Sequence, residues 1–237
     1  RKPPSVSFAQ AATLPVTFLT ADYALNDIGR IKAGDRVLIH AVTGGVGMAA
    51  TQIALAAGAE VIGTASAGKR DLARALGVHH VFDSRSLSFV ADVQRVTNGA
   101  GVDIILNSLA GDFIPASLGL MAEGGRFIEI GKSDDWDANK VAEAFPGVAY
   151  TRLYLGEVTA VDPVAMRDRL ARILADCESG TLHALPHRLY LIEQAEDAFR
   201  FMGQGQHTGK IVITQHRTVR LRPDATYAIT GGLGGLG

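Results

Sequence analysis

Short apolar runs recur between residues 35 and 155, and stretches with helical spacing of their apolar positions separate them. Runs that are apolar throughout are typical of strands buried on both faces of a parallel sheet. The six predicted strands are RVLIHA (36–41), EVIGTAS (60–66), HHVFDS (79–84), VDIILNS (102–108), RFIEIG (126–131) and VAYTRLYL (148–155). The predicted helices between them are GGVGMAATQIALAAGA (44–59), KRDLARALG (69–77) and stretches near 87–97 and 112–121. This alternation predicts an α/β fold with a doubly wound parallel sheet of the Rossmann type.

The pattern differs on both sides of this sheet. Residues 1–34 predict a loop followed by a helix, with capping residues from Ser5 onward. Beyond the last predicted strand, the expected elements are a helix (163–179), a strand (185–192), a short helix (193–202) and a final strand (209–214). Residues 215–225 are polar and basic and contain Pro223, which indicates a linker.

Composition removes several classes of function. A formal net charge of −1 gives no overall field that would attract nucleic acid or an acidic membrane surface. The single Cys177 excludes a disulfide framework and a thiolate zinc cluster, and the histidines lack a ligand-like grouping, so no metal site is expected. No apolar stretch approaches the ~20 residues of a membrane helix, and no leader pattern opens the chain. A cytoplasmic location is expected.

A glycine-rich turn joins the first predicted strand to its helix. Small residues at 44, 47 and 50 allow a tight turn, a close backbone approach to a pyrophosphate and close packing of helix against strand. The helix N-terminus would add amide donors and the positive end of its dipole. We therefore expect a dinucleotide to bind at Thr43, Gly44, Gly45, Val46 and Gly47.

The end of the second predicted strand indicates which dinucleotide binds. NAD-dependent enzymes carry an acidic residue there, about 20 residues after the first glycine, for the ribose 2′-hydroxyl. This chain has Thr64 and Ser66 instead, followed by Lys69 and Arg70. Hydroxyls and cations suit a 2′-phosphate, so NADPH is favoured. The alternative is that the two cations are surface charges at the start of a helix.

Several motifs together resemble one known family. RVLIHAVTGGVGMAATQIA, GVDIILNSLAG, GGRFIEIGKSD and FRFMGQGQHTGKIV are similar to the enoyl reductase domain of type I modular polyketide synthases and animal fatty acid synthases. This is a zinc-free branch of the medium-chain dehydrogenase/reductase superfamily. The resemblance covers nearly all of residues 4–214. The final TYAITGGLGGLG resembles the first strand and cofactor turn of a ketoreductase domain, so the chain looks like a piece of a longer polypeptide.

The resemblance implies a division of the chain into five segments. They are an entry segment from a truncated substrate-binding domain (1–34), a dinucleotide-binding Rossmann domain (35–180), a return segment of the substrate-binding domain (181–214), the linker (215–225) and the start of a ketoreductase domain (226–237).

The activity implied by the resemblance is NADPH-dependent reduction of a trans-2-enoyl thioester carried on an acyl carrier protein. The implied partners are that carrier, through its phosphopantetheine-linked chain, and neighbouring synthase domains including the ketoreductase. A homodimer could form through the parent synthase. No nucleic acid or membrane partner is expected.

Lys132 is the expected proton donor of this reaction. It follows the fifth predicted strand, and Gly131 before it permits a close turn. A lysine ammonium can stabilise an enolate and, if desolvated, release its proton. The family pattern has its catalytic lysine here, whereas an exposed lysine at a strand end is the alternative.

The chain departs from the family pattern in the next strand. The family commonly has an aspartate there as partner of the lysine, and this chain has Tyr154. Glu157 is three positions further, which would turn it to the other face of a strand. Tyr154 is therefore either a second proton donor or a sign that proton transfer is impaired.

Asn107, Ser108 and Leu109 end the fourth predicted strand and are expected beside the nicotinamide and its ribose. An Asn-Ser pair in this place could equally be a helix N-cap.

Three functions therefore stay open on the sequence. The first is the polyketide synthase enoyl reductase, and the second is a free-standing quinone or alkenal oxidoreductase of the same superfamily. The third is a reductase fold that no longer turns over and is kept as a structural part of a megasynthase. The reason for this hypothesis is Tyr154, which stands in place of the aspartate of the family pattern.

Overall fold

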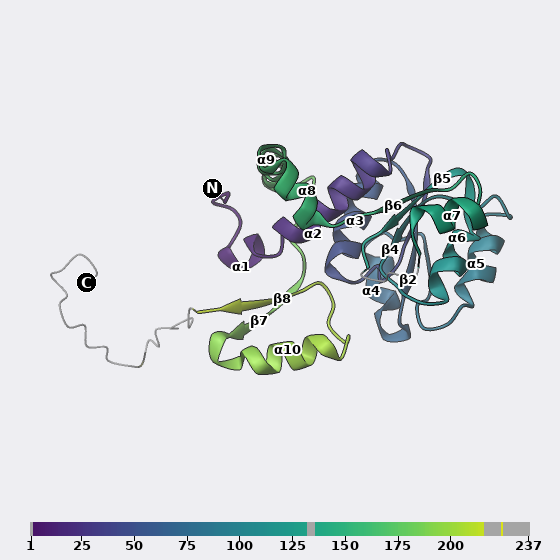
Figure 1. The fold of residues 1–237 in the computed structure, drawn as a ribbon. Helices are drawn as coiled ribbons and strands as arrows, with labels where there is room; N and C mark the ends of the chain where they lie inside the picture. The colour runs from purple at the N-terminus through teal and green to yellow at the C-terminus, as the bar shows by residue number, and fades with distance from the viewer. Residues whose placement is uncertain (1, 132–135, 216–223, 225–237) are drawn as a thin grey trace.

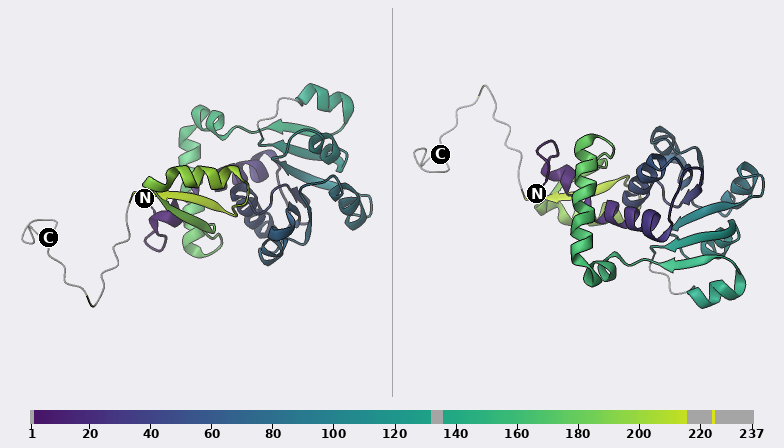
Figure 2. Two further views of the ribbon diagram at one scale, coloured as in Figure 1. Left: turned by 90° about the horizontal axis from the view of Figure 1, so that it is seen from below. Right: turned by 90° about the horizontal axis from the view of Figure 1, so that it is seen from above.

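A computed structural model describes residues 2–131, 136–215 and 224. Two of the sequence predictions fall outside these residues: the role of Lys132, and the ketoreductase start at 226–237. The described chain contains a six-stranded sheet and a separate two-stranded sheet. Figures 1 and 2 show that the smaller sheet and its helix stand to one side of the larger one.

The larger sheet is parallel throughout and has the strand order β3-β2-β1-β4-β5-β6. This is the order of a doubly wound dinucleotide-binding fold, which confirms the predicted fold class. The strands are β1 (Arg36–Ile39), β2 (Glu60–Ala65), β3 (His80–Asp83), β4 (Val102–Asn107), β5 (Met121–Glu129) and β6 (Ala149–Arg152). All six correspond to predicted strands, although β5 begins earlier and β6 ends earlier than the sequence indicates.

Helices cover both faces of this sheet (Figure 1). Successive residues of β1 face opposite sides, so Val37 and Ile39 join one apolar cluster and Leu38 joins the other. The continuous apolar runs of the sequence follow from this double coverage. The helices around the sheet are α3 (Gly45–Ala56), α4 (Arg70–Ala75), α5 (Phe89–Val96), α6 (Phe113–Leu118), α7 (Ala138–Ala144), α8 (Leu155–Val161) and α9 (Pro163–Ser179), with a 3₁₀ turn, η2 (Ala67–Lys69), before α4.

The amino-terminal segment forms three short elements where one helix was predicted. They are α1 (Phe8–Ala11), α2 (Pro15–Asp22) and a π-helical turn, η1 (Tyr23–Ile28). Ser7 and Gln10 form a capping box at the start of α1. Pro15 then lacks the amide that a continuous helix would need, and it begins α2 instead.

The smaller unit consists of β7 (His187–Leu191), a 3₁₀ turn η3 (Ile192–Gln194), α10 (Ala195–Gly203) and β8 (Lys210–Thr214). β7 and β8 are parallel, and α10 makes the crossover between them. The loop after α10 returns to the larger unit, because the Gly209 amide donates to the Thr43 carbonyl at 3.0 Å. The predicted division into five segments stays a prediction.

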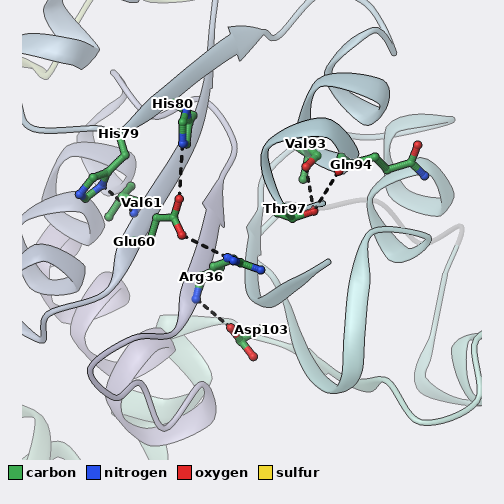
Figure 3. Close-up of polar contacts among 9 residues, drawn as sticks. All are labelled: Arg36, Glu60, Val61, His79, His80, Val93, Gln94, Thr97 and Asp103. Atoms are coloured by element: carbon green, nitrogen blue, oxygen red, sulfur yellow. Dashed lines mark hydrogen bonds and ion pairs between the residues drawn. The ribbon is translucent and has the colours of Figure 1, made fainter. Parts of the chain in front are cut away.

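Charged side chains at the amino-terminal edge of the larger sheet are paired with one another (Figure 3). Arg36 Nε donates to Glu60 Oε2 at 3.1 Å, and the Arg36 amide donates to Asp103 Oδ2 at 2.8 Å. His80 Nε2 lies 3.4 Å from the other oxygen of Glu60. These contacts join the starts of β1, β2, β3 and β4, so this edge of the sheet is a structural one. The opposite edge holds the candidate site.

Candidate active site

The glycine-rich turn lies at the carboxyl end of β1, where the strand order reverses between β1 and β4. Open α/β sheets bind ligands at this point. Gly44 is the N-cap of α3, and no side chain caps that helix. The amides of its first turn therefore have no intrahelical acceptor and are open to an anion. A Cβ atom at Gly47 would lie 2.8 Å from Cα of Val42, so only glycine permits this approach of helix and turn.

His40, the residue that follows β1, is buried and lies within hydrogen-bond distance of two hydroxyl groups. His40 Nδ1 lies 3.0 Å from the Thr64 hydroxyl, and its Nε2 lies 2.8 Å from the Ser117 hydroxyl. Burial lowers the pKa of His40 to about 3, so the ring is neutral near pH 7. Thr64 is fully buried and its hydroxyl contacts His40, and its predicted contact with the cofactor stays a prediction.

A pocket of about 270 Å³ opens beside the turn. Four segments that are far apart in the sequence line it, and they come from both units of the structure. The lining residues are Ala41, Thr43, Gly44, Ala65, Ser66, Lys69, Ser84, Arg85, Gly205 and His207. Of the described carboxylates, none lines this pocket, which agrees with the absence of an acid at the end of β2.

Lys69 and Arg85 supply the positive charge of the pocket, whereas Arg70 does not line it. The Arg70 guanidinium forms an ion pair with Asp83 at 3.2 Å, and its predicted place in the cofactor site stays a prediction. Arg85 was missed by the sequence analysis. Its position in the sequence could have revealed it, because Arg85 comes two residues after the third strand. The carboxyl ends of all strands in a parallel sheet lie at one edge, which is also the edge of the glycine-rich turn.

The loop after α10 closes one side of the pocket. Lys69 Nζ donates to the carbonyls of Gly205 and His207, each at 2.7 Å. Burial, together with Arg85, lowers the pKa of Lys69. His207 Nδ1 is buried and has no hydrogen-bond partner among the described residues. The pocket therefore combines two cations, an unsatisfied ring nitrogen and uncapped helix amides, which together fit the phosphates of a dinucleotide.

The predicted nicotinamide residues lie at the carboxyl ends of β4 and β5. Asn107 is fully buried, Ser108 is exposed, and Leu109 is half-buried. The Asn107 side chain donates to the Leu109 carbonyl at 2.8 Å and accepts from the Leu109 amide at 3.2 Å. Asn107 also donates to Glu129 at 2.5 Å, and Glu129 accepts from the Gly131 amide at 2.5 Å. The structure thus brings Asn107, Leu109 and Gly131 together around Glu129, a residue that the sequence analysis did not single out.

Tyr154 lies just beyond β6, as the N-cap of α8, and is half-buried. The Arg152 guanidinium carbon lies 5.9 Å from the centre of its ring. The predicted strand over 148–155 is too long, since β6 ends at Arg152. Glu157 is therefore in the first turn of α8, and the argument that it faces the other side of a strand does not hold.

Comparisons with known proteins show the family of this chain. The profile of the family described as "Zinc-binding dehydrogenase" matches residues 76–213. A component of the pikromycin polyketide synthase, PikAII of Streptomyces venezuelae, is 47% identical over the whole chain, which spans 6% of that protein. The crystal structure of CurK enoyl reductase is 44% identical with a TM-score of 0.86, covering 90% of this chain and 64% of that one.

A shorter structure matches over nearly its whole length. It is the nucleotide-binding subdomain of the enoyl reductase domain of PpsC from Mycobacterium tuberculosis, 40% identical with a TM-score of 0.65. This chain covers 97% of it, and the match covers 72% of this chain. The chain belongs to the polyketide synthase enoyl reductases of the zinc-binding dehydrogenase family.

Quinone oxidoreductases are more distant relatives of this enoyl reductase domain. One from Pseudomonas syringae is 28% identical with a TM-score of 0.80, covering 89% of this chain and 66% of that one. A mycobacterial relative, Rv1454c, was solved as a complex with NADPH; it is also 28% identical, with a TM-score of 0.80, and covers 89% of this chain and 67% of that one. The sequence identity is higher with the synthase enoyl reductases than with the quinone oxidoreductases. A free-standing quinone oxidoreductase is therefore the weaker of these two enzyme hypotheses.

The name of the family raises the question of zinc. Within the described ranges, no group of three or more histidine, cysteine or carboxylate side chains could hold a metal ion. Cys177 is a free thiol on α9, and burial raises its pKa, which disfavours the thiolate that binds zinc. These residues do not fit a zinc site.

The described part of the chain contains no helix with the length and apolar character that a membrane span requires.

Proposed function

We propose that this domain binds NADPH and uses it to reduce a trans-2-enoyl thioester to the saturated acyl thioester. The observation that carries the proposal is the acid-free, cationic pocket beside the uncapped start of α3. A 2′-phosphate at Ser66, Lys69 and Arg85 would meet two cations there. The pyrophosphate would lie against Thr43, Gly44, Gly45, Val46 and Gly47.

The reacting end of the cofactor would lie at the other side of the turn, against Asn107, Ser108, Leu109 and Gly131. When bound, the reduced nicotinamide would supply a hydride to the β-carbon of the enoyl group. The domain must then stabilise negative charge on the thioester oxygen and deliver one proton to the α-carbon. Lys132 and Tyr154 would serve these two needs, because each carries an acidic N–H or O–H group and each follows a strand that ends at this edge.

The substrate would arrive on an acyl carrier protein, since the relatives are polyketide synthases and this chain spans only a small part of their length. A homodimer formed through the parent synthase stays a prediction. Neighbouring synthase domains follow from the same relatives, and a ketoreductase after this domain is part of the proposal.

The test is oxidation of NADPH by the domain together with the residues that precede it in its synthase, with crotonyl-pantetheine as substrate. We expect oxidation that depends on the thioester, and a fall of about 100-fold or more in kcat when Lys132→Ala removes the donor. An unchanged kcat in that variant contradicts the role of Lys132, and oxidation of NADPH without thioester contradicts the reduction itself.

Tyr154 motivates a second candidate, a reductase fold that binds NADPH and no longer turns over. Its side chain stands where the family resemblance leads us to expect an aspartate. The variant Tyr154→Asp separates the two candidates in the same assay. Activity in the natural sequence favours the working enzyme, whereas activity gained only with Tyr154→Asp favours the impaired domain.

A further inference from the structure

Glu129 is a buried carboxylate inside an otherwise apolar strand. Its side chain is fully buried at the end of β5, where the neighbouring residues Phe127 and Ile128 belong to the apolar cores. Burying a carboxylate costs several kcal/mol unless its oxygens find donors. The mechanism proposed above does not use this group, so its presence calls for another explanation.

Both oxygens of Glu129 accept hydrogen bonds from the segments expected to flank the nicotinamide. Oε2 accepts from the side-chain amide of Asn107 on β4, and Oε1 accepts from the backbone amide of Gly131, each at 2.5 Å. The Glu129 carbonyl also accepts from the Leu153 amide at 2.8 Å, just before Tyr154. One residue therefore links the carboxyl ends of β4, β5 and β6.

The carboxylate also decides which way the Asn107 amide faces. An ionised carboxylate can only accept hydrogen bonds, so Asn107 must present its NH₂ group to Glu129. Its carbonyl oxygen is then the atom that receives the Leu109 amide, at 3.2 Å. The hydrogen bonds between the Asn107 side chain and the backbone of Leu109 are thus oriented by the contact of Asn107 with Glu129.

Gly131 is glycine because of the same carboxylate. A Cβ atom at this position would lie 2.7 Å from Glu129 Oε1, closer than a carbon can approach. The Glu129 carboxylate occupies the space that a side chain at residue 131 would need. A side chain at residue 131 would therefore displace the carboxylate from its hydrogen bonds with Asn107 and the residue 131 amide.

We propose that Glu129 is a positioning residue for the reduction, which holds residues 107–109 and 131 in the one arrangement that the bound nicotinamide and the enoyl group require. This inference rests on the function proposed above. Burial raises the pKa of Glu129, and the Asn107 and Gly131 donors and the charge of Arg152 offset this rise only in part. The geometry, in which each oxygen faces an N–H donor, is that of a double acceptor.

The variant Glu129→Gln tests the proposal with a nearly isosteric side chain. A glutamine must turn its NH₂ group toward either Asn107 or Gly131, both of which are donors, so one hydrogen bond is lost. We expect kcat with crotonyl-pantetheine to fall about 10- to 100-fold, which corresponds to one unsatisfied buried group. The Kd for NADPH should stay within about threefold, because the phosphate pocket is at the other side of the turn.

Two further variants make the result specific. Glu123→Gln changes an exposed glutamate on the same strand and should leave kcat and Kd unchanged. Glu129→Asp keeps a side chain that can only accept hydrogen bonds, one methylene shorter, and we expect it to retain at least about fivefold more kcat than Glu129→Gln. A difference of this kind does not follow from a general loss of stability.

The fluorescence emission of bound NADPH provides a readout that needs no turnover. Its wavelength reports the surroundings of the nicotinamide, so we expect a shift between the unchanged domain and Glu129→Gln, and none with Glu123→Gln. If the domain binds NADPH and does not reduce the thioester, the proposed reduction fails and the emission alone decides the role of Glu129. Equal kcat and emission in Glu129→Gln and the unchanged domain overturn the proposal. A loss of NADPH affinity as large as the loss of kcat also overturns it, because that result indicates a structural role only.

Discussion

Three cations, Lys69, Arg70 and Arg85, lie at or next to the pocket beside the glycine-rich turn, and their contacts differ. Lys69 and Arg85 line the pocket, whereas Arg70 is paired with Asp83. The sequence places Lys69 and Arg70 side by side and gives no reason to separate them. The distinction arises because neighbouring residues on η2 and α4 point in different directions.

We expect Lys69→Ala and Arg85→Ala to raise the Kd for NADPH by about tenfold or more, because each removes a charged donor of the 2′-phosphate. The Kd for NADH, which lacks that phosphate, should change much less. Arg70→Ala is the matched control and should leave both constants within about threefold. Fluorescence titration with the two cofactors measures this, and an effect confined to Arg70→Ala would contradict the assignment of the pocket.

His40 makes the stability of the domain depend on pH. Its folded pKa of about 3 lies below its ordinary value of 6.5, so the unfolded chain binds the proton more readily. The free energy of unfolding should therefore be highest above pH 6.5 and fall as the pH is lowered toward about 3. Urea unfolding at a series of pH values measures the slope, and His40→Gln should flatten it; an equal slope in that variant argues against His40 as its source.

Single residues were harder to predict than the fold, for a physical reason. β2 is buried on both faces, so the sequence does not reveal that Thr64 faces His40 while Ser66 reaches the pocket. Glu129 has a visible signal, since it is the only acid inside the apolar run RFIEIG. Its contacts with Asn107 and Gly131 depend on which strands are neighbours. The sequence predicts a parallel, doubly wound sheet but does not by itself give the order of the strands in it.

At the scale of elements, apolar runs located the six strands of the larger sheet, most clearly the inner strands β1, β2 and β4, where burial on both faces removes polar residues. The ends of elements were less certain. Leu153-Tyr-Leu continues the apolar pattern of β6, although the chain has already turned toward α8 at this point. A strand and the first turn of a helix can share such a short pattern, and the error over Glu157 follows from this ambiguity.

The loop from α10 to β8 is an element that joins the two units. It holds two glycines with left-handed backbone, Gly205 and Gly209, each with a φ of 62°. A Cβ atom at Gly205 would meet nothing within 4 Å, whereas one at Gly209 would collide with the Pro186 carbonyl. The Gly209 amide also donates to the Thr43 carbonyl in the glycine-rich turn.

This pair of glycines gives a matched comparison. Gly205→Ala should lower the free energy of unfolding by about 1–2 kcal/mol, the cost of a left-handed alanine. Gly209→Ala should cost more and should also weaken NADPH binding several-fold, because the displaced loop moves away from Thr43 and Lys69. Urea unfolding and cofactor titration of both variants measure these effects. Equal losses in the two variants would show that the contact with Pro186 and the glycine-rich turn is unimportant.

At the scale of the whole molecule, the cofactor should stabilise both units together, because the pocket is lined from each of them. NADPH at 100 times its Kd should raise the free energy of unfolding by about 2.7 kcal/mol. NADH at the same concentration should raise it less. Thermal unfolding monitored by circular dichroism measures both effects. Two separate transitions, of which NADPH moves only one, would contradict the joint contribution of the two units.

The contacts of Lys69 limit where the junctions of a hybrid synthase can be placed if this domain is moved from one synthase to another. A lysine ammonium has three N–H donors, and the carbonyls of Gly205 and His207 already receive two hydrogen bonds from it. A hybrid whose junction lies before residue 204 would pair this pocket with a foreign loop and a different set of acceptors. Junctions placed after Thr214, at the end of β8, keep the lysine and its own loop together.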